Sequence, residues 1–270
     1  MATAIDAGPN AANPPTAESG PAPPLQVRTI ELADLIQCIE QGVKDFIHAP
    51  QYGLFFGAVY AVGGLTIVWL TLAFGYFYLA YPFVMGFALF APFGAAGTYE
   101  VSRRLENNEP LSWSGVLGAV WGRAGKELAW LALVSLFTFI VWLDLAVFLF
   151  LMFYGLNVPT LAQLFTEVFT TAYGIAFLLV GNGLGAIIAL IVFSFTVVSP
   201  PLIVDRDVDF VTAMSTSVKA VRANPRPMLA WAIVIGADLA ISFATVFVAL
   251  LVVFPVLGHT TWRLYRKLIV

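Results

Sequence analysis

Charged residues are scarce in this 270-residue chain. They make up 11% of it, whereas hydrophobic residues make up 60%. Soluble globular domains carry roughly 25% charged and about 45–50% apolar residues. So few charges do not cover the surface of a soluble domain of this size. The composition therefore argues against a soluble enzyme and a disordered chain, and it predicts a multi-pass protein of the lipid bilayer.

Cysteine, histidine and basic charge are also scarce. The single cysteine, Cys38, excludes an internal disulfide, a thiolate zinc site and an iron–sulfur cluster. Thirteen basic and sixteen acidic residues give a net charge of −3, so no basic field for nucleic acid is present. No nucleophile–base pair and no metal-ligand set is visible. We therefore expect no catalytic site, no cofactor and no metal.

The chain outside its long apolar runs has two kinds of segment. Residues 1–27 are rich in Ala, Pro, Gly, Asn and Ser without apolar periodicity, which predicts a disordered N-terminal tail. Three stretches with helical apolar spacing, at 31–47, 112–126 and 208–223, predict amphipathic helices at the membrane surface.

Long apolar runs predict the membrane domain, residues 28–270. A spanning helix needs about 20 apolar residues. The expected spans are about 52–74, 82–99, 128–154, 174–199, 228–243 and 245–262. The fold class expected is an all-α membrane protein with six transmembrane helices, arranged as three hairpins.

The positions of Lys and Arg set the expected topology. No basic residue lies in 51–102, 127–205 or 227–262. Cytoplasmic loops carry the excess of Lys and Arg. If every basic cluster is cytoplasmic, an even number of spans separates each cluster from the next. This interpretation gives six spans in a bacterial inner membrane, with both termini and the three amphipathic helices in the cytoplasm.

A weak internal repeat accompanies this topology. Val43-Lys44 followed by Pro50 has the same spacing as Val218-Lys219 followed by Pro225. Each pair precedes an odd-numbered span. The stretch from Trp113 to Ala124 takes the equivalent place before the third span, so we expect three units, each with an amphipathic helix, two spans and a proline break near the cytoplasmic surface.

Three polar residues fall within the expected spans at similar depth: Asp144, Asn182 and Asp238. Ionisable residues in the bilayer are expensive and mark functional sites by default. If the three side chains converge on one point, they would form a cation or proton path, as in a small transporter or channel. The alternative is that they form hydrogen bonds between helices and fix packing, and we favour this alternative.

Small residues predict close helix packing. Gly181-Asn182-Gly183-Leu184-Gly185-Ala186 matches the dinucleotide fingerprint G-x-G-x-x-[GA], but that motif acts only between a strand and a helix start. Within an apolar span, Gly181 and Gly185 are better explained as a helix-packing pair, and Gly53 and Gly57 as another. We expect no nucleotide.

Two further motifs have a functional and a structural explanation. His48 and His259 are the chain's two histidines, and a bis-histidine haem needs two facing imidazoles. Because His48 lies on an interfacial helix, we favour histidines bonded to backbone or headgroups. Asp205, Asp207 and Asp209 lack the glycine and glutamate of a calcium loop. We expect Asp209 to cap the helix that follows.

Several motifs together resemble a bacterial family of predicted integral membrane proteins, domain-of-unknown-function family 2189. They are Gly86-Phe87-Ala88-Leu89-Phe90-Ala91-Pro92, Gly97-Thr98-Tyr99-Glu100, Ser102-Arg103-Arg104-Leu105-Glu106, Ser199-Pro200-Pro201, Asp205-Arg206-Asp207-Val208-Asp209, Asn224-Pro225 and Phe254-Pro255 through His259 to Trp262. The resemblance covers roughly residues 30–268. It implies a multi-pass membrane protein and assigns no functional residues.

Some members of that family carry a provisional label as a cytochrome c oxidase component. A haem–copper catalytic subunit needs more histidine ligands than the two present here. If the label applies to this chain, it therefore applies as an accessory subunit and not as the catalytic one. We therefore expect a non-enzymatic accessory or scaffolding subunit that packs against other membrane-protein subunits.

Overall fold

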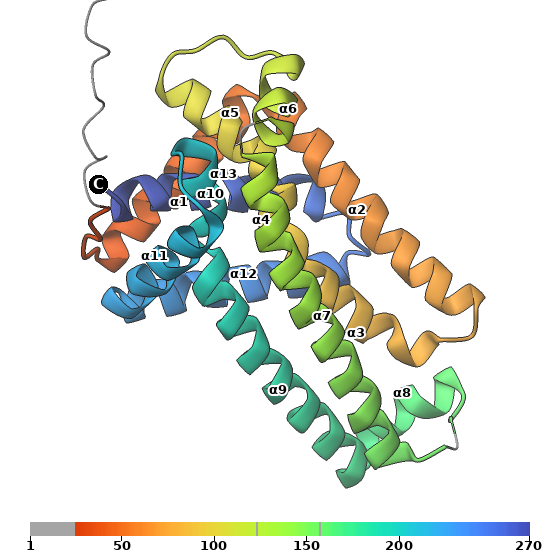
Figure 1. The fold of residues 1–270 in the computed structure, drawn as a ribbon. Helices are drawn as coiled ribbons and strands as arrows, with labels where there is room; N and C mark the ends of the chain where they lie inside the picture. The colour runs from red at the N-terminus through yellow and green to blue at the C-terminus, as the bar shows by residue number, and fades with distance from the viewer. Residues whose placement is uncertain (1–24, 123, 157) are drawn as a thin grey trace, which may run out of the picture.

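A computed structural model describes residues 25–122, 124–156 and 158–270, and these residues are almost entirely helical (Figure 1). The helices in chain order are α1 (Leu32–His48), α2 (Pro50–Ala73), α3 (Phe77–Phe87), the 3-10 turn η1 (Ala88–Phe90), α4 (Ala91–Gly94), α5 (Ala96–Glu106), α6 (Trp113–Trp121), α7 (Gly125–Tyr154), α8 (Leu161–Thr170), α9 (Ala172–Thr196), α10 (Ser199–Asp205), α11 (Phe210–Ala223), α12 (Pro225–Ala244) and α13 (Leu250–Leu268). The expected all-α class is confirmed. Residues 1–24 of the expected tail lie outside the described residues.

Five segments of the described chain are long and apolar enough to cross a membrane. They are Pro50–Ala73, Phe77–Glu106, Gly125–Tyr154, Ala172–Asp205 and Pro225–Ala244. These correspond to the first five expected spans, so the multi-pass character is confirmed. The six-span, three-hairpin layout is not confirmed, because the run expected at 245–262 falls partly on the turn before α13, and α13 carries three basic residues towards its end.

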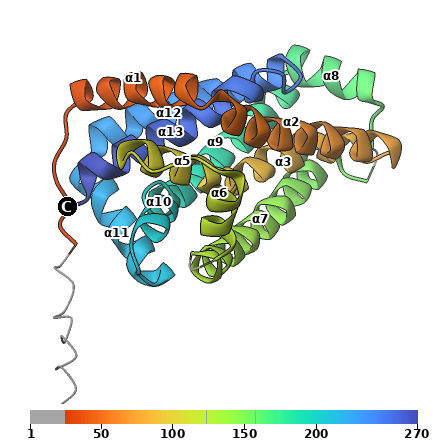
Figure 2. The same ribbon diagram turned by 90° about the horizontal axis from the view of Figure 1, so that it is seen from above.

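Helix α13 lies at the centre of the fold, packed against α1, α2 and α5 (Figure 2). One face of its second half is buried, including the large side chains Trp262, Leu264, Tyr265 and Leu268. This half is amphipathic, with basic residues beside the buried face. Burial in protein, instead of in lipid, accounts for its polar content.

The amphipathic helix α1 exposes large apolar side chains, which an amphipathic helix of a soluble protein would bury. Its apolar residues Leu32, Ile36 and Ile47 are at least half exposed. The buried face consists of Leu35, Cys38, Gly42 and Asp45. In a bilayer an exposed apolar stripe is covered by lipid, so this orientation suits a helix lying in the interface.

The repeat at the two prolines is visible in the backbone. Ala49, before Pro50, has φ −137° and ψ 52°, and Asn224, before Pro225, has φ −129° and ψ 53°. A residue before proline is kept out of the helical region, so α1 and α11 each end there and a span begins at the proline. The two motifs therefore share their backbone geometry, whereas the full threefold repeat stays a prediction.

Two other surface helices differ from expectation or were missed. The helix expected at 112–126 is shorter, since α6 ends at Trp121 before Gly122. Helix α8 was not predicted, although Thr160 and Gln163 form a capping box at its start. The expected cap of α11 is confirmed, because Asp209 accepts a hydrogen bond from the Thr212 backbone N–H at 2.9 Å. Figure 1 shows α8 at one end of the α7–α9 hairpin and α6 and α11 near the other.

The two ends of the described chain pair through their backbones. Val27 and Ile269 form an antiparallel bridge. The Arg28 N–H donates to Leu268 O at 2.8 Å, and the Val270 N–H donates to Gln26 O at 3.1 Å. The last residues of the expected tail are therefore attached to the C-terminus.

Candidate functional site

Two features of the described chain gather polar or functional side chains, and they lie at different depths. The first is a buried polar cluster of Asp45, Ser102, His259 and Arg263, next to the surface helices. The second is an apolar cavity between the candidate spans.

The buried polar cluster is centred on Asp45, which is 6% exposed. Its Oδ2 accepts hydrogen bonds from Ser102 Oγ and from Arg263 Nε, both at 2.8 Å, and its Oδ1 accepts from an Arg263 terminal nitrogen at 2.7 Å. The bidentate guanidinium contact neutralises a carboxylate that would otherwise be costly to bury. The helices α1, α5 and α13 supply these residues and are held together by them.

His259 completes the cluster and is fully buried. Its Nδ1 lies 2.7 Å from Ser102 Oγ. Because the Ser102 hydroxyl donates its proton to Asp45, it accepts from Nδ1–H, which assigns the proton of the neutral ring to Nδ1. Within the described chain, Nε2 has no hydrogen-bond partner. Burial lowers the pKa of His259 to about 4, against which the nearby Asp45 raises it.

The residue types of this cluster are those of a hydrolase triad, but the arrangement differs. In such a triad the acid holds His Nδ1 and Nε2 takes the serine proton. Here Ser102 stands between the acid and Nδ1, and it is fully buried. The cluster is thus a polar core that fixes three helices.

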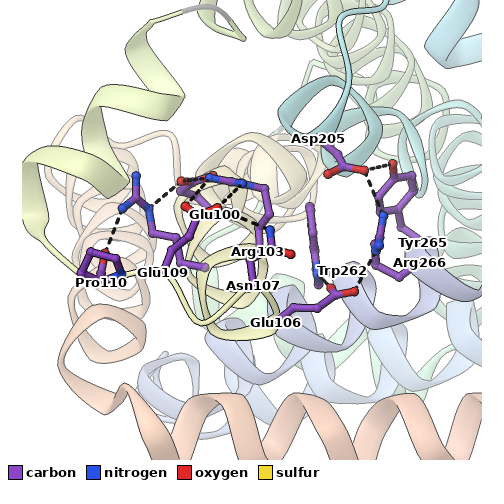
Figure 3. Close-up of polar contacts among 11 residues, drawn as sticks. Glu100, Arg103, Glu106, Asn107, Glu109, Pro110, Asp205, Trp262, Tyr265 and Arg266 are labelled. Carbon is purple, nitrogen blue, oxygen red and sulfur yellow. Dashed lines mark hydrogen bonds and ion pairs between the residues drawn. The ribbon is translucent and has the colours of Figure 1, made fainter. Parts of the chain in front are cut away.

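A second layer of charged residues extends from this core towards the surface (Figure 3). Glu100 accepts from both Arg103 and Arg104 at 2.6–2.9 Å. Glu106 accepts from Trp262 Nε1 at 3.0 Å and from Arg266 Nε at 3.1 Å. The first set of contacts links residues within α5, and the second set links α5 to α13.

Asp205, at the end of α10, completes this layer. It accepts from the Tyr265 hydroxyl at 2.6 Å and from Arg266 at 3.3 Å. Residues of three separate sequence motifs, containing Glu106, Asp205 and Trp262, therefore meet in one network (Figure 3).

The apolar cavity has a volume of about 500 Å³. It lies between the long helix that runs from α3 to α5 and the helices α9, α12 and α13. Small residues make room for it, notably Gly185, Ala189, Ala232 and Gly236. Tyr81, Asn182 and Leu239 lie at one end, and Thr196, Leu229 and Thr261 lie towards the other.

The structure does not bring the three intramembrane polar residues together. Asn182 lines the cavity, where its Oδ1 accepts from the Tyr81 hydroxyl at 2.6 Å. Asp144 is exposed on α7, and Asp238 is half-buried on α12; neither lines the cavity. A cation or proton path would need these residues to converge, and the described residues show no such convergence.

The four expected packing glycines have different surroundings. A Cβ at Gly53 would lie 2.9 Å from Pro255 Cβ, and one at Gly57 would lie 2.6 Å from Leu250 O, so both glycines lie against α13. A Cβ at Gly185 would lie 3.0 Å from the Trp142 ring. Gly181 has no described atom within 4 Å of a Cβ position, so no neighbouring helix requires a glycine there.

The two histidines lie in different environments. The exposed His48 bonds through Nδ1 to Lys44 O at 2.6 Å, as expected for an interfacial histidine, whereas His259 is buried beside Ser102. Among the residues that the structure describes, no group of three or more His, Cys, Asp or Glu side chains is placed to hold a metal ion.

Sequence reasoning missed the buried polar cluster. The available signal was the spacing of Asp45, which continues the helical stripe of Leu35, Cys38 and Gly42. The motif residues Ser102 and His259 were noted, but nothing in the sequence pairs them.

Comparison with known proteins gives one match. No curated protein and no solved structure matches the chain significantly. A family model described as "Predicted integral membrane protein (DUF2189)" matches residues 79–205, from α3 to the end of α10. This segment contains Glu100, Glu106 and Asp205 of the charged layer. The resemblance is thereby confirmed over residues 79–205, a shorter stretch than the expected 30–268, and over these residues the chain is similar to the DUF2189 family of predicted integral membrane proteins.

Proposed function

We propose that this protein is a non-enzymatic accessory or scaffolding subunit that packs against other membrane-protein subunits through the outer face of α7. The single observation that carries the proposal is the outward position of Asp144. Trp142, two residues earlier, contacts Gly185 of α9. Because successive residues of an α-helix turn by about 100°, Asp144 faces away from α9, and it is exposed.

The depth of Asp144 makes this position costly in lipid. It lies ten residues before Tyr154, the last residue of α7, which is about 15 Å along the helix and close to the middle of a hydrocarbon core of about 30 Å. An acidic residue at a helix centre costs about 2.5–3.5 kcal/mol, and such residues almost always face protein or water. A hydrogen-bond donor on a neighbouring subunit would offset this cost.

The hairpin that carries Asp144 has much surface left for a partner. In α9, of the described side chains, only Gly174, Val192 and Thr196 are buried. Leu179, Ile187 and other large apolar residues of α9 are more than half exposed.

The basic clusters support placement in a bacterial inner membrane with both termini cytoplasmic. The oxidase label of some family members makes a respiratory or other energy-transducing complex the first assembly to examine.

The test is to purify the full chain in mild detergent and measure its stoichiometric partners by native mass spectrometry. We expect Asp144→Leu to weaken the association by about 0.6–2 kcal/mol, the range for hydrogen bonds between membrane helices. Asp207→Leu makes the same chemical change in an exposed loop and should leave the association unchanged. Either a parent chain that purifies without a partner or an Asp144→Leu variant that assembles as well as the parent would refute the proposal.

The transporter alternative has less support. It requires Asp144, Asn182 and Asp238 to share a path, and only Asn182 lines the cavity. Proton or ion flux through reconstituted parent protein, lost in both Asp144→Asn and Asp238→Asn, would favour it over the accessory role.

A further inference from the structure

The cavity runs along one half of the membrane and stops near its middle. On α9 its lining extends from Asn182 to Val197, a length of about 22 Å. Asn182 lies ten residues from Ala172, the first residue of α9, so it is about 15 Å from that end and near the midplane of a core of about 30 Å. At this point the hydrogen bond from Tyr81 to Asn182 joins α3 to α9.

The lining is almost wholly apolar and partly open to the side. A water molecule in such a cavity needs two to four polar partners, which the lining does not offer along its length. Helices α9 and α12 line two sides of the cavity yet pack little against each other. Ile233 and Leu229, which lie on the α12 side, are 63% and 53% exposed. The gap between α9 and α12 is therefore wide enough for the hydrocarbon of a surrounding bilayer to enter.

A basic residue lies beyond the open end. Arg226 is exposed, and it makes no ion pair with the residues that the structure describes. It precedes Leu229, Ile233 and Gly236 on the cavity face of α12 by three, seven and ten residues, so it continues that face. Its guanidinium is suited to an anionic headgroup at the membrane surface.

We propose that this cavity binds one acyl chain of an anionic phospholipid, with the headgroup at Arg226 and the tail ending at the Tyr81–Asn182 hydrogen bond. A spanning helix of a partner protein does not fit the same space. Such a helix must continue through the full thickness of the core, whereas the hydrogen bond between Tyr81 and Asn182 joins α3 to α9 across this end of the cavity. A lipid tail ends at the midplane of the bilayer.

The experiment uses the full chain reconstituted in vesicles that contain phosphatidylglycerol with a diazirine near the end of one acyl chain. After irradiation, mass spectrometry maps the labelled peptides. We expect labelling beside Tyr81 and Asn182. Gly236→Leu places a side chain in the cavity and should reduce this labelling by about tenfold, the factor for displacing roughly two methylene groups. Ala189→Leu fills the cavity from α9 and should act alike.

Gly183→Leu is the matched control. Gly183 lies on the same helix as Asn182, has no described atom within 4 Å of a Cβ position and does not line the cavity. Labelling beside Tyr81 and Asn182 in the Gly183→Leu variant should equal that in the parent. Arg226→Gln should reduce labelling by the phosphatidylglycerol probe more than labelling by the matching phosphatidylcholine probe.

Three results would overturn the proposal. The first is labelling beside Tyr81 and Asn182 that Gly236→Leu and Ala189→Leu leave unchanged while both proteins stay folded. The second is labelling by diazirine-bearing palmitic acid without labelling by the phospholipid, which would assign the cavity to a free fatty acid. The third is a crosslink from the cavity lining to another protein chain, which would assign it to a partner helix.

Discussion

At the scale of single residues, the described chain satisfies its buried charges in pairs and leaves one ring nitrogen of a buried histidine without a hydrogen-bond partner. Asp45 and Glu100 each meet a guanidinium, and both carboxylates are almost completely buried. His259 stays neutral because its ring is buried and its Nδ1–H is already used at Ser102. Protonation of Nε2 would place a charge where the described chain offers no acceptor.

The stability of the protein should therefore fall as the pH falls. The pKa of His259 is about 4 in the folded protein and about 6.5 when unfolded. The unfolded state then binds more protons between these values, so acidification favours unfolding. We expect the free energy of unfolding to drop by about 2 kcal/mol from pH 7 to pH 5, measured by thermal denaturation in detergent.

The second histidine provides the control for this pH dependence. His259→Gln should flatten it, while His48→Gln, at an exposed position, should keep it. The pKa values of Asp34 and Asp209 are lowered by their hydrogen bonds, so these carboxylates titrate below this pH range. Equal stability of the parent at pH 7 and pH 5 would show that His259 is accessible to water in the folded state.

At the scale of elements, the closest helix contact that involves an expected packing residue is that of α2 with α13. Gly53 and Gly57 bring the two backbones together, and Pro255 and Leu250 of α13 occupy the space that side chains would need. Tyr60, one turn further along α2, stacks on Phe254 with ring centroids 4.2 Å apart.

Gly57→Ala should destabilise the protein by about 1–3 kcal/mol, the cost of overpacking a close contact. The new methyl group would lie 2.6 Å from Leu250 O and 2.9 Å from Leu251 Cα, and these backbone atoms belong to a packed helix. The matched variant Gly181→Ala meets no described atom and should be neutral or raise stability by up to about 1 kcal/mol through helix propensity. Thermal unfolding of both variants tests this predicted difference in stability. Equal melting temperatures would contradict the close approach of α2 and α13.

The sequence predicted long spans better than it predicted which way helices face. Apolar runs alone define α2, α7 and α9, because a bilayer-crossing helix needs length and hydropathy. The facing of α1 was not predictable, because an apolar stripe such as Leu32 and Ile36 suits either a protein core or lipid. The shared depth of Asp144 and Asn182 followed from counting along spans, but their directions depend on helix rotation, which packing sets.

At the scale of the whole molecule, the paired chain ends constrain the number of membrane crossings. Residues 26–28 and 268–270 share backbone hydrogen bonds, so they lie on one side of the membrane. The pairing is compatible with an even number of crossings between them. Five segments of the described chain are apolar enough to cross, and a sixth crossing, expected at 245–262, stays a prediction.

This inference gives a topology prediction. Reporters fused at the N-terminus and after Val270 should be active in the same compartment, and the basic clusters predict that it is the cytoplasm. Paired fusions with a reporter active only in the cytoplasm and one active only outside test this on the full chain. Opposite locations for the two ends would mean that five crossings are the true number and that residues 26–28 do not pair with the C-terminus in the membrane.

The pairing of the chain ends also fixes the order of events during synthesis. Helix α1 is synthesised before the candidate spans, whereas its packing partner α13 and the paired residues 268–270 are synthesised after them. Until α13 has been synthesised, the face of α1 that carries Asp45 has neither Arg263 nor His259 beside it. The nascent protein must therefore keep α1 at the membrane surface through the insertion of every span. Synthesis of α13, and not the insertion of an earlier helix, is the step that completes this packing.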